Sequence, residues 1–430
     1  MVLPSQNPSS NTSPVKTLPA PFNRLAWSNL AAQSAEQIAL SAAPIIAVVL
    51  LGVGEGQTGL LQTALTLPFI LFAIPAGLLA DRMSRRWLMA GAETLRVLAL
   101  IGILLLILTG WLTLPALAAL GFISVCGTVA YSVAAPALVP ALVPPALLAA
   151  ANARIELART VAFTVGPALG GFLVGWIGAS PAFGCAAALS ILAVLLLLGI
   201  HEPARPSMPP RHPLQDIREG AAFVFHHPLL RPVFIVQFVF GVGWFVILAV
   251  FVPFAVRDLG LSPTGIGIVL GMYGVGMTAG ALLATRIMRR LPFGTVVATG
   301  PVTGCIASAV IASTMYFPYP VLAGLGFFLL GAGPILWLIS TTTLRQSVTP
   351  PRLLGRVSAI NTLSFGARPL GAAIGALVGG LYGAETCFGV AVAIFAAQAL
   401  LIVISPAASL RSQPDMIEDG AAARARQAVL

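Results

Sequence analysis

The chain has 430 residues, of which 58% are hydrophobic and only 8% are charged. An ordinary soluble domain carries about 25% charged residues, so this composition excludes a water-soluble enzyme and indicates a protein with many membrane spans. The net charge of +10 does not indicate nucleic-acid binding, because the basic residues are spread between apolar segments and do not cluster on one polar domain.

A polar tail precedes a series of long apolar segments. Residues 1–23 are rich in Pro and Ser, and we expect them to be disordered; they lack the basic and then apolar order of a cleavable signal peptide. Each apolar segment is long enough to cross about 30 Å of hydrocarbon at 1.5 Å per residue. Twelve spans are predicted, at residues 26–52, 57–80, 87–110, 114–138, 149–176, 180–200, 231–255, 263–286, 293–316, 320–344, 354–380 and 383–405.

The distribution of basic residues predicts the orientation. When the loops are assigned alternately to two sides, the side of the N-terminal tail carries 18 of the 23 Lys and Arg residues, and the other side carries Arg257 alone. Basic loop residues concentrate on the cytoplasmic side of a membrane. The sequence therefore predicts an even number of spans with both termini in the cytoplasm.

A polar interruption and an internal repeat divide the chain into two halves. Residues 77–86 and 281–290 are identical at six of ten positions, at an offset of 204 residues. Duplicated halves are typical of secondary transporters. The predicted fold is an all-α membrane protein with two six-helix bundles, at 24–200 and 231–406, a cytoplasmic linker at 201–230 and a cytoplasmic tail at 407–430. Within the linker, residues 214–225 form either a short helix on the membrane surface or a solvated segment.

The repeated segment carries the first resemblance to a known family. Residues 77–86 read Gly-Leu-Leu-Ala-Asp-Arg-Met-Ser-Arg-Arg and resemble the signature of the major facilitator superfamily of transporters, departing at Ser84, where glycine is usual. The resemblance implies a central cavity that opens alternately to the two sides. It also implies a gate in which Asp81 binds the start of the eleventh span, near Gly355; the alternative is a basic loop that only sets topology. The implied gating residues are Gly77, Asp81, Arg82, Arg85 and Arg86.

A second resemblance concerns the direction of transport. Gly166, Pro167, Gly170 and Gly171 match the Gly-Pro-x-x-Gly-Gly core of a motif associated with exporters that exchange their substrate for protons, although Ala162 replaces an upstream glycine. The run 136–152 is similar to the subgroup of bacterial siderophore exporters, of the enterobactin type, and macrolide efflux pumps. These resemblances imply proton-driven export of an amphiphilic small molecule, with a siderophore favoured. The alternatives are a multidrug or macrolide efflux pump, an importer, and a non-transporting receptor.

Charged residues inside the predicted spans are costly and are therefore functional candidates. Glu93 with Arg96, and Glu156 with Arg159, are spaced i, i+3, which places each pair on one helix face and predicts intrahelical ion pairs.

Glu36 has no base within a helical turn, and it lies near mid-membrane on a polar stripe with Asn29, Gln33 and Gln37. It either binds and releases protons during transport or pairs permanently with Arg368, Arg96 or Arg159. Arg368, just before Pro369, alternatively faces an anionic or polar substrate.

Several further residues are candidates for the cavity wall, because the family resemblance assigns that wall mainly to spans 1, 4, 7 and 10. Aromatic and apolar walls suit a bulky amphiphile, although each aromatic side chain by itself is equally explained by packing. The candidates are Asn29, Gln33, Tyr131, Gln237, Phe240, Trp244, Tyr273, Trp337 and Ser340.

Intramembrane catalysis and ATP hydrolysis are excluded by what the spans lack. All four histidines lie in the central linker and all five aspartates lie in loops or tails, so no Ser–His dyad, aspartyl pair or His-Glu-x-x-His metal site can form in the bilayer. No phosphate-binding loop motif is present, and four well-separated cysteines predict neither disulfides nor a metal site. We expect no enzyme activity and no cofactor besides the proton gradient. The expected partners are a small-molecule substrate and the lipid bilayer, and no nucleic acid. We expect a monomer that crosses the bacterial cytoplasmic (inner) membrane many times.

Overall fold

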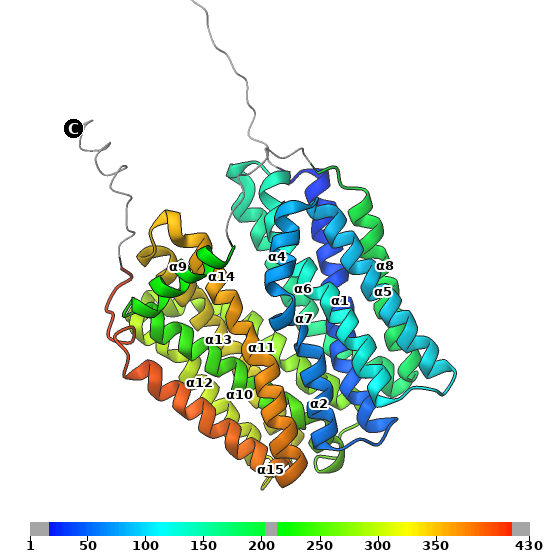
Figure 1. Ribbon diagram of the computed structural model, residues 1–430. Coiled ribbons are helices and arrows are strands. Elements are labelled where there is room, and N and C mark those ends of the chain that lie inside the picture. The colour runs from blue at the N-terminus through cyan, green and yellow to red at the C-terminus, as the bar shows by residue number, and fades with distance from the viewer. Residues whose placement is uncertain (1–16, 203–212, 415–430) are drawn as a thin grey trace, which may run out of the picture.

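The computed structural model describes residues 17–202 and 213–414, and within these ranges the chain is helical, without strands. Most of the expected N-terminal tail, part of the linker and most of the C-terminal tail lie outside the described residues. The remaining elements form two groups of helices, one before and one after the linker (Figure 1).

The first bundle contains one bent span, in which a 43° bend separates Glu55–Leu71 from Ala73–Ala80. Pro75 explains the bend, because proline has no N–H to donate to the carbonyl four residues earlier, that of Leu71. The elements of this bundle are α1 (Ala20–Val49), α2 (Glu55–Thr66), α3 (Pro68–Leu71), α4 (Ala73–Arg82), α5 (Arg85–Leu108), α6 (Leu114–Leu142), η1 (Pro145–Leu147), α7 (Leu148–Trp176) and α8 (Ala179–Leu198).

The second bundle follows α9 (Pro213–His226), which is helical where the sequence offered a helix at 214–225 as one of two alternatives. Its last long helix turns at Gly383, where φ is 82° and two helices meet. The elements are α10 (Leu230–Arg257), α11 (Pro263–Arg290), α12 (Phe293–Ser313), α13 (Pro320–Val348), η2 (Pro351–Leu353), α14 (Leu354–Leu363), η3 (Ser364–Gly366) and α15 (Ala367–Val403).

The helices have the length and hydropathy of membrane spans. Among the described residues, ten helices are long and apolar enough to cross a membrane, or eleven if the bent α2–α4 segment counts as one span. One of the ten is the 50-residue stretch Leu354–Val403, which includes the turn at Gly383. The chain is therefore a multi-pass membrane protein, whereas the count of twelve spans and the cytoplasmic termini stay predictions.

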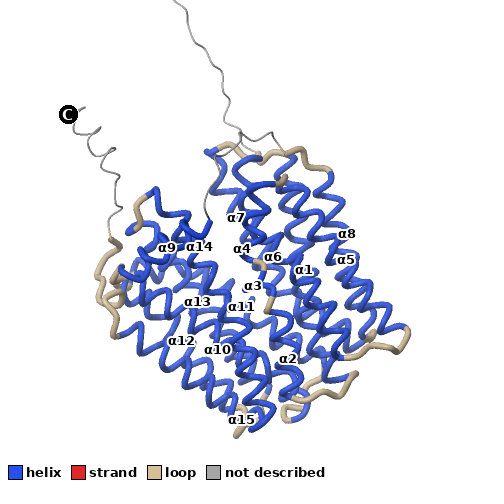
Figure 2. The backbone as a smooth tube through the Cα atoms, viewed as in Figure 1, coloured by secondary structure: helices blue, strands red, loops and turns tan. Residues whose placement is uncertain are grey.

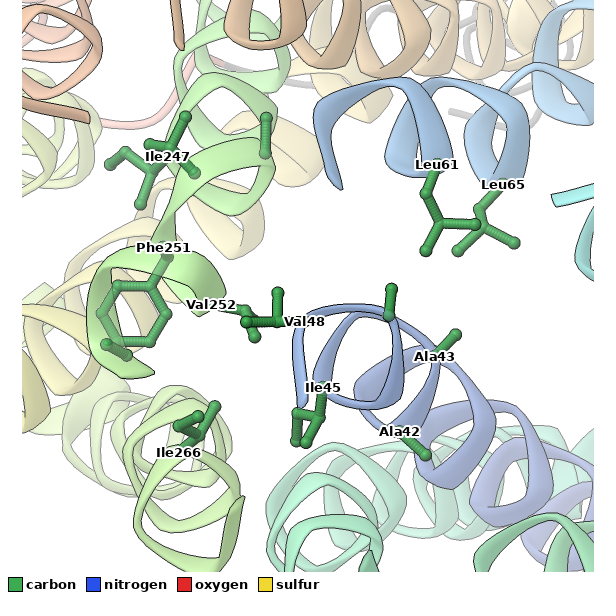
Figure 3. Close-up of a cluster of buried hydrophobic side chains, with 14 of the residues drawn as sticks. Ala42, Ala43, Ile45, Val48, Leu61, Leu65, Ile247, Phe251, Val252 and Ile266 are labelled. Atoms are coloured by element: carbon green, nitrogen blue, oxygen red, sulfur yellow. The ribbon is translucent and has the colours of Figure 1, made fainter. Parts of the chain in front are cut away.

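The two bundles meet at one end and diverge at the other (Figure 2). We call the diverging end the termini side, because the described chain begins and ends there, beside α9 and the start of α14 (Figure 1). We call the opposite end the far side; it carries the loops 50–54 and 258–262 and the turn within α15. A buried hydrophobic cluster joins the bundles towards the far side. Figure 3 shows its residues from α1 and α2 beside those from α10 and α11, among them Val48, Leu61, Val252 and Ile266.

Candidate functional site

A cavity of about 1760 Å³, part of it open to solvent, lies between the two bundles and has walls from both. The first bundle contributes α1, α2, α3 and α7, and the second contributes α10, α11, α13, η3 and α15. Three charged side chains line it: Glu36, Arg159 and Arg368. Its aromatic lining consists of Phe69, Phe163, Phe240, Trp244, Phe245, Tyr273, Phe327, Trp337 and Phe365.

Glu36 is in the wall of this cavity, and its ion pair with Arg96 is a long one. Its carboxylate makes no hydrogen bond within the described part of the chain, and its nearest cation is Arg96, with Nη2 4.0 Å from Oε2. Arg96 is engaged elsewhere: it lies 2.8 Å from Glu93, donates to the carbonyl of Ala32 at 3.0 Å and to the hydroxyl of Thr128 at 2.5 Å. The carboxylate of Glu36 therefore remains available to a proton or a ligand.

Both pairs expected at i, i+3 spacing are present. Glu93 and Arg96 are 0% and 2% exposed, so this pair belongs to the interior of the first bundle. Arg159 Nε donates to both carboxylate oxygens of Glu156, at 3.1 and 3.0 Å. Glu156 is 53% exposed and does not line the cavity, so it is not the buried charge that the sequence indicated. Arg159 is consequently not a permanent partner of Glu36.

Arg368 is surrounded by phenylalanine rings. Its guanidinium carbon lies 4.3 Å from the ring centroids of Phe69 and Phe365 and 5.9 Å from that of Phe245. Within the described residues no carboxylate lies within 4.0 Å of it, and it makes no hydrogen bond. Phe69 belongs to the first bundle and the other two rings to the second, so the surroundings of Arg368 are assembled from both.

Some of the expected wall residues line the cavity, and others do not. Gln237, Phe240, Trp244, Tyr273 and Trp337 line it; Gln237 also donates to the hydroxyl of Ser364 at 2.8 Å.

The remaining expected wall residues, Asn29, Gln33, Tyr131 and Ser340, do not line the cavity. Tyr131 is buried in the first bundle, with its hydroxyl 3.2 Å from that of Ser28. Asn29 is 2% exposed and Ser340 is fully buried, with its hydroxyl bonded to the carbonyl of Trp337.

The far side of the cavity is closed by contacts between the bundles. Arg257 of α10 lies 3.3 Å from Glu55 of α2 and donates to the carbonyl of Val53 at 3.1 Å. Nearby, α2 and α15 pack so closely that a Cβ on Gly59 would lie 2.4 Å from Cα of Ala376. The cavity is thus sealed on the far side, and the bundles diverge on the termini side.

The Gly-Pro-x-x-Gly-Gly segment of α7 contributes to this closure. A Cβ on Gly166 would lie 2.4 Å from Cβ of Gln37 in α1, and one on Gly170 would lie 2.5 Å from the hydroxyl of Ser41. A Cβ on Gly171 would lie 2.4 Å from the carbonyl oxygen of Pro263 in α11. The absence of side chains therefore allows one helix to pack against its own bundle and against the other, and Pro167 lines the cavity between them.

The signature segment 77–86 lies on the termini side. Ser84 caps α5, accepting from the amide of Trp87 at 3.4 Å, with an ordinary φ of −59°, so glycine is not required there. The carboxylate of Glu202 accepts from the hydroxyl of Ser84 at 2.5 Å and from the amides of Arg85 and Arg86 at 3.3 and 3.1 Å. Sequence reasoning missed Glu202, an acid next to a basic helix N-terminus in space but far from it in the chain.

The other residues expected in the gate differ in how the structure places them. Arg85 donates to the carbonyl of Ala137, Arg86 lies 4.8 Å above the ring of Trp87, and Arg82 is exposed. The side chain of Asp81 lies outside the described residues. A Cβ on Gly77 would meet nothing within 4 Å, so no other described helix packs closely against Gly77 in this conformation.

The start of α14, the expected partner of this gate, is held by the linker helix. Arg356 Nε lies 2.7 Å from Asp216 of α9, and Arg356 also pairs with Glu219. Sequence reasoning did not foresee these contacts. Within residues 17–202 and 213–414, no three His, Cys, Asp or Glu side chains gather to hold a metal ion.

Comparisons with known proteins agree with this architecture. The sequence model of the Major Facilitator Superfamily matches residues 25–367. The enterobactin exporter EntS of Citrobacter koseri is 26% identical over 333 residues, which are 76% of each chain. The multidrug efflux pump Tap of Mycolicibacterium fortuitum is 28% identical over 71% of this chain and 76% of its own. The MFS-type transporter y4rN of Sinorhizobium fredii is 31% identical, but the match spans only 56% of that relative.

Solved structures share the fold at low sequence identity. The nucleoside transporter NupG matches 89% of this chain and 99% of its own with a TM-score of 0.70 and 16% identity. A bacterial homologue of the iron transporter ferroportin, in an inward-facing state, matches 90% of this chain and 98% of its own with a TM-score of 0.69 and 16% identity. These proteins are transporters and not enzymes, and the chain belongs to the Major Facilitator Superfamily.

Proposed function

We propose that this chain exports an amphiphilic small molecule across a bacterial cytoplasmic membrane in exchange for protons, by alternating access, and that a siderophore is the favoured substrate. The proton gradient is its energy source, and it needs no cofactor. Its partners are the substrate and the lipid bilayer, not nucleic acid, and it acts as a monomer with both termini in the cytoplasm.

The observation that carries this proposal is the position of Glu36. Its carboxylate lies in the wall of a cavity with walls from both bundles and has no hydrogen-bond partner among the described residues. A carboxyl group in such a place is accessible to protons, and its two protonation states interact differently with a bound ligand and with the opposite bundle. Proton exchange at Glu36 would therefore bias the choice between the two access states.

The direction and the substrate class rest on the relatives and on the cavity. EntS and Tap are named as exporters, and Gly171 of the exporter-like segment lies at the contact between bundles. The aromatic lining, in which the ring centroids of Trp244 and Tyr273 lie 4.7 Å apart, suits a large molecule with apolar surface. A multidrug efflux pump is the second candidate, because the relative Tap is one and the same lining would accept varied amphiphiles.

Deleting the gene in the source organism tests the proposal. Spent medium and cell extracts of the deletion strain and its parent are compared for small molecules. We expect at least one amphiphilic compound to be depleted from the medium and retained in the cells. The wild-type gene should restore release, and Glu36→Gln should not. Glu385→Gln, which alters an exposed acid on the far side, is the control and should restore release as the wild type does.

Other outcomes contradict the proposal. A compound that the deletion strain leaves in the medium would show import. No difference for any compound, including added antibiotics and dyes, would indicate a protein that does not transport. Loss of resistance to several unrelated drugs, with no endogenous compound retained, would favour the multidrug alternative.

A further inference from the structure

One of the three charged side chains that line the central cavity is unpaired. Arg159 is bound by Glu156, and Glu36 lies 4.0 Å from Arg96. Arg368 has neither a carboxylate within 4.0 Å nor a hydrogen-bond acceptor in the described part of the chain. A guanidinium stays charged in proteins and offers five N–H donors. The cavity therefore contains a permanent positive charge whose donors are unused.

The three phenylalanine rings position this charge without neutralising it. Phe69 and Phe365 are both 4.3 Å from the guanidinium carbon and meet edge to face, with centroids 6.3 Å apart and planes at 86°. Phe245 lies farther away, at 5.9 Å. Aromatic faces attract a cation, but they cannot accept the N–H···O bonds that a guanidinium makes in its own plane. The head of Arg368 is thus oriented and its hydrogen-bonding capacity is kept for another group.

The same wall offers surface for an apolar body. Phe69, Phe245 and Phe365 line the cavity beside Arg368, and the neighbouring rings of Trp244 and Tyr273 line it too. A planar oxyanion suits a guanidinium because two parallel N–H···O bonds form at once. A ligand with an aromatic ring next to that oxyanion would pack against phenylalanine while its charge meets Arg368.

We propose that Arg368 and its phenylalanine surroundings form a subsite for an aromatic carboxylate or phenolate, so that the substrate class of the cavity is aromatic anions. This inference rests on the proposed function in one respect, namely that the central cavity is the place where substrate binds. It adds the charge of the substrate and the residue that recognises it.

A structural role for Arg368 makes a different prediction. Phe69 comes from the first bundle and Arg368 from the second, so their contact also joins the bundles. If it served only that purpose, replacing Arg368 would affect neutral and anionic ligands equally. A matched pair of probes that differ only in charge separates the two roles.

The test uses 2-naphthoate and its neutral analogue 2-naphthamide. Each is equilibrated by dialysis against the purified full chain in lipid nanodiscs, and binding is followed by naphthalene fluorescence. We expect the wild type to bind 2-naphthoate at least tenfold more tightly than 2-naphthamide. Arg368→Gln should weaken 2-naphthoate about tenfold and leave 2-naphthamide unchanged, which also shows that the cavity remains folded. Arg368→Lys, which keeps the charge but loses the planar fork, should give an intermediate preference.

Two further variants complete the test. Arg352→Gln removes an exposed arginine outside the cavity and should bind both probes as the wild type does. Glu36→Gln removes a negative charge from the same cavity and should tighten 2-naphthoate. The proposal is overturned if the wild type binds both probes equally or binds neither, or if Arg368→Gln keeps the preference or weakens both probes alike.

The binding measurement is independent of export. Selective binding of 2-naphthoate without release of any compound from cells would contradict the proposed export function but support the anion subsite. Proton-driven release of a compound by a chain that binds the two probes equally would support export and contradict the anion subsite.

Discussion

Glu55 and Arg257 form a 3.3 Å ion pair that joins α2 of one bundle to α10 of the other on the far side, 202 residues apart in sequence. Arg257 is the one basic loop residue that the sequence assigned to that side. The pair closes the same end of the cavity as the tight helix contacts of Gly59 and Gly171. The conformation is therefore sealed at one end by groups that would have to separate under the proposed alternating access.

Breaking this ion pair should favour opening of the far side. Partly exposed ion pairs contribute about 0.2–1 kcal/mol, so Arg257→Gln should raise the far-side-open population about 1.4- to fivefold. The reporter is Val252→Cys in a chain whose native cysteines are replaced, because Val252 lines the cavity and is only 2% exposed in this conformation. The measurement is the rate at which an impermeant maleimide, added from the far side, labels this cysteine. The charge-swapped double variant Glu55→Arg/Arg257→Glu is the control, and its labelling rate should return towards that of the parent. An unchanged labelling rate in Arg257→Gln would show that the ion pair does not stabilise the closed state.

Filling the helix contact at Gly171 should have a larger effect. A leucine there would overlap the carbonyl of Pro263, and overpacking costs typically 1–3 kcal/mol. Gly171→Leu should therefore disfavour far-side closure and abolish transport while the chain still inserts into the membrane. Gly91→Leu is the control, because a Cβ on Gly91 would meet nothing within 4 Å. Equal transport by the two variants, measured as release of the exported compound, would refute a role for this contact in the cycle.

Replacing one partner of the buried pair Glu93–Arg96 should destabilise the chain more than replacing both. Removing one partner of a buried ion pair leaves an uncompensated charge and costs about 3–5 kcal/mol, whereas replacing both by apolar residues is often close to neutral. Glu93→Leu should therefore lower the thermal unfolding temperature of the purified chain more than Glu93→Leu/Arg96→Met does. Additive losses in the double variant would mean that the two residues contribute independently of their contact.

The overall architecture could be predicted from sequence because it depends on local patterns. Hydropathy over 20 residues reports burial in lipid, and the repeat at 77–86 and 281–290 reports two related bundles. The i, i+3 spacing of Glu93 and Arg96 was sufficient to predict their contact. The bend before Pro75 was not predicted, since it interrupts a segment that the sequence treats as one span, 57–80. The turn at Gly383, by contrast, lies where the sequence separates its last two spans, 354–380 and 383–405.

The candidate site was predicted only in part because its contacts join distant segments. The lack of a local base marked Glu36 as a candidate, but the sequence left open whether it serves proton exchange or pairs permanently with an arginine of another span. The rings around Arg368 come from positions 69, 245 and 365, and no spacing in the sequence relates them. Glu202 binds the start of α5 from more than 110 residues away. Tyr131 was assigned to the cavity by its span, but its side chain faces the interior of the first bundle.

The most direct test of proton exchange through Glu36 is accumulation of the exported compound in proteoliposomes that contain the purified chain. An imposed pH gradient, acidic inside, should drive at least tenfold accumulation by the wild type. Glu36→Gln should abolish this accumulation and still exchange labelled for unlabelled compound without a gradient, because the cavity is intact. Accumulation by Glu36→Gln at the wild-type level would contradict the account.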